Sequence, residues 1–172
     1  MNEAVSDLRA ATPDRPLAAD PYEKMLAAAA AILLAFVIVA VARGRPEWAL
    51  IPAIIWAHLA TIVIALALTP VMLLRRRGDQ AHRQLGRVWA ASMVLTAFLS
   101  LFVRLSNHGG FSLIHILSVY TLIQVPLLVW FARQHNIRRH RRAVRAMVTG
   151  ALLIAGFFTF PFGRLLGHWL FG

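Results

Sequence analysis

Four of the seven histidines recur at a nearly fixed distance along the chain, and paired histidines are the residues that bind haem iron. His115 follows His58 by 57 positions, and His140 follows His82 by 58 positions. Two neutral imidazoles on facing helices supply both axial ligands of a six-coordinate b-type haem. The sequence therefore offers two candidate iron sites, one for each histidine pair.

The histidines belong to a longer internal repeat, which covers residues of about 50–105 and 111–162. The matched features are Pro70 with Pro126, the basic run after Leu74 with the one after Ala132, and His82-Arg83-x-x-x-Arg87 with His140-Arg141-x-x-x-Arg145. Self-similarity at a fixed offset signals a duplicated unit. We therefore predict a core of two repeated two-helix hairpins, with the first helix added outside it.

Five apolar segments must position these residues. Hydrophobic residues make up 59% of the chain, whereas soluble domains have roughly 45–50%. The segments cover residues 25–42, 49–74, 88–103, 111–132 and 146–162, and a last amphiphilic stretch covers 163–172. Because lipid offers no hydrogen bonds to the backbone, helices are expected rather than open strands. The fold class is thus all-α: an integral membrane helical bundle of about five transmembrane helices.

The arginines predict how the bundle is oriented. Eleven of them lie in the loops after the second and fourth apolar segments, and such loops face the cytoplasm. The N-terminus is then inside and the C-terminus outside. Residues 1–24 are expected to form a flexible cytoplasmic tail, and residues 25–172 a single transmembrane domain. The formal charge is +11, but the short basic clusters between apolar runs indicate membrane loops and no nucleic-acid partner.

This orientation assigns a level to each histidine pair. The sixteen residues from His58 to Leu74 span about 24 Å, which is most of the hydrocarbon thickness. We expect His58 and His115 near the outer face, and His82 and His140 near the inner face. Haem propionates prefer cationic partners. The candidates are Arg83, Arg87, Arg141 and Arg145 at the inner site, and Arg104 and Arg164 at the outer site.

Other chemistry is poorly supported by the residue types. The chain has no cysteine, which excludes disulfides, thiolate metal sites and covalent haem attachment through cysteine. No carboxylate follows Asp79, and five of the seven acidic residues precede the first apolar segment. Paired-carboxylate catalysis inside the membrane is therefore not expected.

Two resemblances extend this interpretation. The run from His58 to His140, with Gly78-Asp-Gln-Ala-His-Arg-Gln-Leu-Gly-Arg87, resembles a bacterial family of predicted membrane proteins, domain of unknown function 2306, over residues of roughly 50–162. The four-histidine layout is similar to two-haem cytochromes of the b561 type. That second resemblance implies one haem near each face and electron transfer across the bilayer. In those cytochromes the ligands lie within the helices, whereas His82 and His140 stand beside arginine clusters.

Two functions follow as hypotheses. The first is a small b-type haem protein, a transmembrane oxidoreductase if it is an enzyme, that carries electrons across or within the bacterial inner membrane. Its candidate cofactors are haem b and a quinone, and its candidate partners are a quinol or a larger membrane complex. The alternative is a non-catalytic accessory or assembly subunit without a cofactor. In that case His82 and His140 add to the positive-inside signal, and His58 and His115 bond to neighbouring helices, for instance through Ser118 or Thr61.

Overall fold

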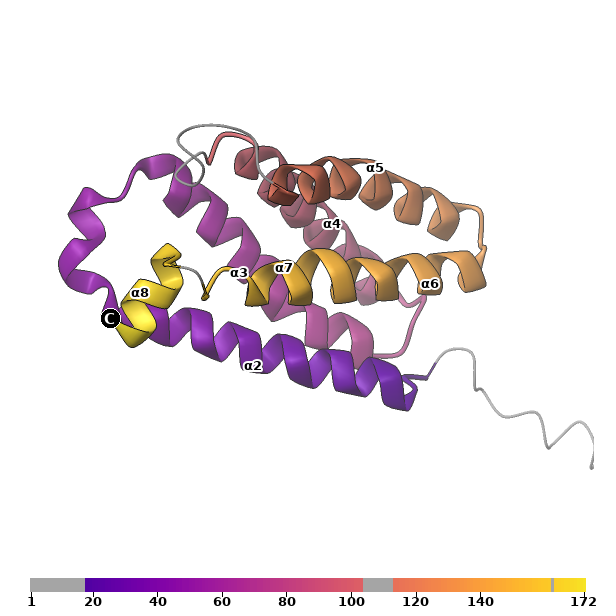
Figure 1. Cartoon of the computed structure of the whole chain (residues 1–172). Coiled ribbons are helices and arrows are strands. Elements are labelled where there is room, and N and C mark those ends of the chain that lie inside the picture. The colour runs from indigo at the N-terminus through magenta and orange to yellow at the C-terminus, as the bar shows by residue number, and fades with distance from the viewer. Residues whose placement is uncertain (1–17, 104–112, 162) are drawn as a thin grey trace, which may run out of the picture.

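The computed structural model describes residues 18–103, 113–161 and 163–172, and every regular element in these ranges is helical (Figure 1). The elements are α2 (Pro21–Arg43), η1 (Arg45–Leu50), α3 (Ala53–Leu74), α4 (Gln80–Ser100), α5 (Leu113–Arg133), α6 (Ile137–Met147), η2 (Val148–Ile154), α7 (Ala155–Phe157) and α8 (Leu165–Phe171). The all-α fold class is confirmed. The part of the predicted tail that covers residues 1–17 lies outside the described residues, as does Arg104.

Helix α2 begins four residues earlier than the apolar segment from which it was predicted. Asp20 accepts a hydrogen bond from the Glu23 backbone N–H at 2.9 Å, and the Glu23 carboxylate accepts one from the Asp20 backbone N–H at 3.1 Å. This reciprocal capping box, with Pro21 at the first helical position, stabilises the helix start. The last residues of the predicted tail are therefore helical.

The two hairpins predicted from the repeat have matching features. Helices α3 and α5 each contain the matched proline. The following helices, α4 and α6, begin with side-chain caps 57 positions apart: Asp79 accepts from the His82 backbone N–H at 2.6 Å, and Asn136 accepts from the Arg139 backbone N–H at 3.1 Å. The second hairpin returns through α6, η2 and α7, which follow one another without a gap.

The helices form a ring in which neighbours along the chain lie side by side. Helix α3 packs against α2 and α4, and α5 packs against α4 and α6. Helix α2 also contacts η2 and α8, so it closes the ring instead of lying outside a four-helix core as predicted. Its inward stripe has helical spacing: Leu26, Ala30, Leu33, Val37 and Ala40 are all buried.

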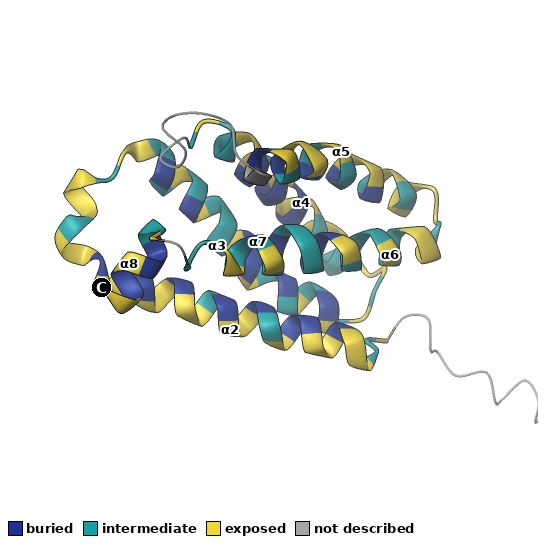
Figure 2. Cartoon of the chain, viewed as in Figure 1, coloured by how far each residue is buried: buried dark blue, intermediate teal, exposed yellow. Residues whose placement is uncertain are grey.

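The outward faces of the long helices are exposed (Figure 2), and many of their exposed side chains are large and apolar. Ile32 on α2, Ile64 on α3 and Ile123 on α5 are each exposed by more than 40%. Three helices in the described part are long and apolar enough to cross a bilayer: Pro21–Arg43, Ala53–Leu74 and the His115–Arg133 part of α5. An exposed apolar belt on long apolar helices indicates a membrane protein.

Candidate functional site

The two predicted outer histidines line one cavity inside the ring. His58 comes from α3 and His115 from α5, and the cavity between them has a volume of about 230 Å³. His115 is buried, with 5% of its surface exposed, and His58 is partly buried. The remaining wall comes largely from apolar side chains of α2, α3 and α4, including Leu33, Leu66 and Met93, together with Gly156 of the returning helix. The structure thus brings this predicted pair to a common space.

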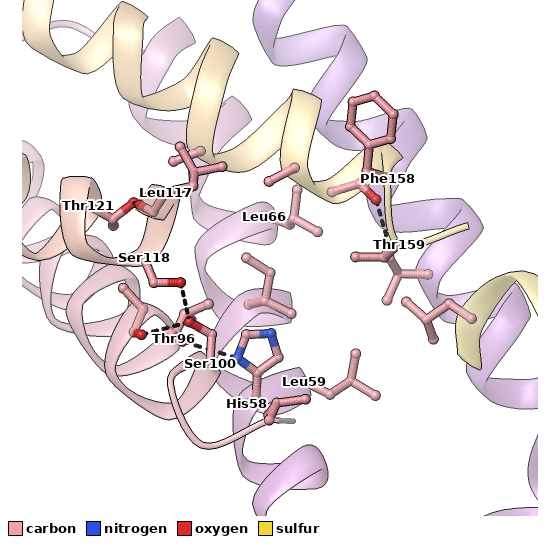
Figure 3. Close-up of a pocket in the computed structure, with 18 of the residues that line it drawn as sticks. His58, Leu59, Leu66, Thr96, Ser100, Leu117, Ser118, Thr121, Phe158 and Thr159 are labelled. Carbon is pink, nitrogen blue, oxygen red and sulfur yellow. Dashed lines mark hydrogen bonds between the residues drawn. The ribbon is translucent and has the colours of Figure 1, made fainter. Parts of the chain in front are cut away.

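The His58 imidazole is oriented by a backbone carbonyl on the neighbouring helix. Its Nδ1 lies 3.1 Å from the carbonyl oxygen of Thr96 on α4 (Figure 3). A carbonyl oxygen only accepts, so Nδ1 carries the proton and donates it. In the neutral ring, Nε2 then holds the lone pair. This is the arrangement that second-shell carbonyls impose on histidines that bind metals.

A group of hydroxyls lies beside His58 on the polar side of the cavity (Figure 3). Thr96 donates from Oγ1 to Thr61 Oγ1 at 2.8 Å, and Thr61 donates to the backbone carbonyl of His58 at 2.8 Å. Ser100 and Ser118 join α4 to α5 through a 2.5 Å hydrogen bond. Sequence reasoning proposed Thr61 and Ser118 as direct partners of the imidazoles. For His58, the structure shows Thr96 in that role instead.

Helix α8 closes one side of the cavity. Arg164, the predicted outer propionate partner, lines the cavity with Leu165 and Leu166. The Trp169 indole N–H donates to Glu47 Oε2 at 2.9 Å, and the indole stacks against Trp56. These contacts place Arg164 at the same cavity as the two histidines.

The α6–η2–α7 element, which forms the return helix of the second hairpin, packs close to α2. Part of it has unusual backbone geometry. The segment η2 has π-helical hydrogen bonding, and Ala151 within it lines the cavity. Gly156 follows it and packs against α2, because a Cβ at this position would lie 2.6 Å from Leu33 Cδ2. Short π-helical stretches occur frequently at functional sites, and this one borders the histidine cavity.

The predicted inner histidines, His82 and His140, lie in the first turns of α4 and α6, at the same end of the bundle (Figure 1). His140 Nδ1 donates to the carbonyl oxygen of Leu128 at 2.8 Å. Arg83 donates to the Gly78 carbonyl at 2.6 Å, and Arg87 donates to the Arg83 carbonyl at 3.3 Å. Neither arginine forms an ion pair within the described ranges.

The other two predicted propionate arginines have protein partners. Arg141 donates to both carboxylate oxygens of Glu23, at 2.7 and 2.8 Å, and Arg145 bonds to Glu23 and Asp20. Arg77 also bonds to Glu23, whose side chain is 1% exposed. This cluster was missed because the acidic residues before the first apolar segment were assigned to a tail. The Asp20-x-x-Glu23 capping pattern before an apolar run was the signal that could have placed Glu23 in a helix start, although it does not reveal the arginine partners.

Hydrogen bonds at this end of the molecule favour the charged forms of two groups outside the apolar segments. A hydrogen bond from the Glu23 backbone N–H and a smaller contribution from the Arg145 side chain hold the pKa of Asp20 below its ordinary value. The hydrogen bond to Glu23 raises the pKa of Arg141. Both shifts stabilise the charged forms, as expected for a compact ion-paired cluster.

Within the described residues, no group of three or more histidine, cysteine, aspartate or glutamate side chains is placed to hold a metal ion. A bis-histidine haem needs only two protein ligands. No protein-family model, curated protein or solved structure matches this chain. The two family resemblances therefore remain predictions from the sequence.

Proposed function

We propose that this chain is a small b-type haem protein that carries electrons across or within the bacterial inner membrane, with a quinol or a larger membrane complex as its partner. The observation that carries the proposal is the single cavity lined by His58, His115 and Arg164. Two imidazoles and one guanidinium are the side chains that hold a haem iron and balance a propionate.

Each residue has a defined role in this proposal. Nε2 of His58 and the imidazole of His115 would hold the haem iron, and the Thr96 carbonyl orients the first of these rings. Arg164 would balance a propionate, while Leu66 and the other apolar side chains would exclude water. When bound, a haem of this kind supplies reversible one-electron transfer. The apolar wall favours a low dielectric around it, which is one determinant of its potential.

Cavity volume sets a further requirement. The cavity of about 230 Å³ is smaller than ligand pockets of roughly 300–1,000 Å³. A macrocycle therefore requires lining side chains to move aside. Met93 is suited to this because its unbranched side chain adapts to irregular space.

The inner pair, His82 and His140, is proposed as a second bis-histidine site. The Leu128 carbonyl orients His140 in the way that the Thr96 carbonyl orients His58. Because Arg141 and Arg145 are paired with carboxylates, the propionate role at this site belongs to Arg83 and Arg87. This site is a weaker candidate than the outer one because both helix starts stand among basic residues.

The topology proposed with this function has five crossings. Helix α4 and the continuous α6–η2–α7 element cross the bilayer in addition to the three long apolar helices. The basic loops face the cytoplasm, so the N-terminus is inside and the C-terminus outside. This arrangement places His58 and His115 in the outer half of the bilayer.

A second candidate function is a non-catalytic accessory subunit that packs against a larger membrane complex. The hydrogen bonds from His58 to Thr96 and from His140 to Leu128 favour it, because they satisfy one nitrogen of each ring within its own hairpin. In this case the histidines join helices and bind no iron.

An absorption spectrum distinguishes the two functions. The purified protein, prepared from haem-sufficient cells, is compared in oxidised and dithionite-reduced forms with His58→Ala, His115→Ala, His82→Ala and His140→Ala. With two haems, each variant loses about half of the reduced α-band; with an outer haem alone, only the first two lose it. His135→Asn is the control, because His135 is exposed and has a φ of 54° that asparagine tolerates. A colourless wild-type protein would leave only the accessory function.

A further inference from the structure

The arginines at the inner end of the molecule fall into two classes, those that form ion pairs and those that do not. Four of them (Arg75, Arg77, Arg141 and Arg145) form ion pairs with Asp79, Glu23 or Asp20, and all four are partly buried. Seven others are exposed or partly exposed and form no ion pair within the described ranges: Arg76, Arg83, Arg87, Arg133, Arg138, Arg139 and Arg142. Within the part of the chain that the structure describes, these seven arginines therefore carry positive charge without an ion-pair partner.

These seven arginines gather at one end of the bundle. The α3–α4 turn, the α5–α6 turn and the N-terminus of α2 lie at the same end, opposite η1 and α8 (Figure 1). The α3–α4 turn and α6 meet at Glu23, because Arg77 from the turn and Arg141 from the helix both hydrogen-bond to its carboxylate. The arginines of both repeats thus contribute to one basic surface, which we call the arginine rim.

Exposed apolar side chains adjoin the arginine rim in sequence. Trp130 and Ile137 are 51% and 48% exposed and flank the α5–α6 turn, and Val88, at 49%, follows Arg87. Arg139 lies over the Phe131 ring, with its Cζ 5.9 Å from the ring centroid. Cationic groups next to exposed aromatic and aliphatic side chains are typical of the boundary between lipid headgroups and acyl chains.

We propose that the arginine rim binds the phosphate groups of anionic phospholipids in the inner leaflet. Guanidinium groups pair with phosphate through two parallel hydrogen bonds, and the adjoining apolar side chains accommodate the acyl chains. The opposite end lacks such a surface: in the described ranges, Arg43 and Arg45 are its exposed arginines. Five of the seven arginines have no role at either proposed haem site, so the proposal does not depend on whether the chain binds haem.

The choice of occupant follows from position and charge. A soluble anion would meet the same guanidinium groups but would gain nothing from the exposed Trp130, Ile137 and Val88. An acidic protein would need the rim to be accessible above the headgroup level. A phospholipid satisfies the guanidinium groups and the apolar side chains together, so the rim is assigned to lipid.

Native mass spectrometry of the full chain in detergent tests this assignment, with phosphatidylglycerol and phosphatidylcholine offered in equal amounts. We expect preferential retention of phosphatidylglycerol. Removing one arginine near the lipid surface costs about fivefold in affinity, so Arg138→Gln/Arg139→Gln/Arg142→Gln should lose on the order of a hundredfold. Arg83→Gln/Arg87→Gln tests the other repeat, and a circular dichroism melt checks that each variant is folded.

The control variant Arg43→Gln/Arg45→Gln removes exposed arginines from the opposite end and should retain phosphatidylglycerol as the wild type does. Three results would overturn the proposal. They are equal retention of both lipids by the wild type, an equal loss in the control variant, and release of bound lipid by millimolar inorganic phosphate at constant ionic strength. The last result would assign the rim to a soluble anion. Co-purification of an acidic protein that excludes phosphatidylglycerol would assign it to a protein partner.

Discussion

At the scale of single residues, Glu23 organises the end of the bundle at which α2 begins. Its carboxylate accepts hydrogen bonds from Arg77, Arg141 and Arg145, which come from the α3–α4 turn and from α6. Residues far apart in the chain therefore meet at one carboxylate. A charge with so little exposure is stable only when it is paired and hydrogen-bonded.

Glu23→Gln tests the importance of this charge. Glutamine keeps the capping box at the helix start, so the change isolates the loss of the ion pairs. Removing one partner of a buried pair costs about 3–5 kcal/mol. We expect about 3 kcal/mol here, because the arginines retain some contact with solvent. The measurement is the free energy of unfolding in mixed detergent micelles.

Glu47→Gln is the matched control at the opposite end. The Glu47 side chain is 42% exposed and accepts one hydrogen bond from Trp169, which glutamine also accepts. We expect a loss below about 1 kcal/mol. Equal losses in the two variants would show that Glu23 is no more important than an ordinary surface carboxylate.

Asp20 gives a pH dependence with a defined sign. Because its pKa in the folded protein is below the ordinary value of 3.8, its contribution is present above that value and is lost as pH falls through the folded pKa. An asparagine at this position remains a good helix cap but carries no charge. We therefore expect Asp20→Asn to lower the unfolding midpoint at pH 7 and to lower it much less at a pH of about 2.5. A gap that stays constant with pH would contradict this linkage.

The repeat grouped His58 with His115, and in the structure both residues line one cavity. It did not predict that Thr96 orients His58, because a backbone carbonyl leaves no mark in the sequence. The pairing of Arg141 and Arg145 with Glu23 was missed for a related reason. It depends on how α2 packs against the second hairpin, and no local pattern encodes that contact.

At the scale of elements, the sequence predicted the presence of the helices better than it predicted where they begin and end. The apolar runs located every long helix, but the helix containing α6 begins at Ile137, nine residues before the predicted apolar segment. Arginines are good helix formers, and Asn136 caps the helix start. The helix therefore extends beyond the apolar run. Hydropathy responds to the lipid environment, whereas helix bounds follow from caps and backbone propensity.

Docking of α8 supplies a prediction at this scale. A Cβ on Gly167 would lie 1.7 Å from the backbone carbonyl oxygen of Phe160, which cannot rotate away. Gly167→Ala should therefore displace α8 at a cost of about 1–3 kcal/mol. Hydrogen exchange of residues 165–171 would accelerate. Gly150→Ala is the control, because a Cβ there meets nothing within 4 Å. Unchanged exchange in Gly167→Ala would show that α8 is not held by this contact.

At the scale of the whole molecule, the ring of helices encloses polar groups and leaves apolar groups outside. Buried His115, Ser118 and Thr121 face inward, whereas Ile116, Val119 and Ile123 on the same helix are exposed. A soluble helix shows the opposite distribution. Composition predicted the membrane environment. The closure of the ring by α2 was not predictable, because a nearly uniform apolar helix does not specify which face packs against which neighbour.

The number of crossings can be measured by labelling single cysteines, because the chain has no native cysteine to give background. Arg45→Cys, Gln80→Cys and Gln134→Cys replace exposed residues in the turns or at a helix start. A membrane-impermeant maleimide applied to intact spheroplasts should label Arg45→Cys at once. It should label Gln80→Cys and Gln134→Cys only after lysis, because an arginine-rich turn is retained in the cytoplasm.

Gln134 distinguishes the five-crossing topology from one with three crossings. If only the three long apolar helices crossed, α4 would stay inside and α5 would carry position 134 to the outer face. Labelling of Gln134→Cys before lysis would therefore exclude the five-crossing topology, and with it the placement of His58 and His115 in the same half of the bilayer.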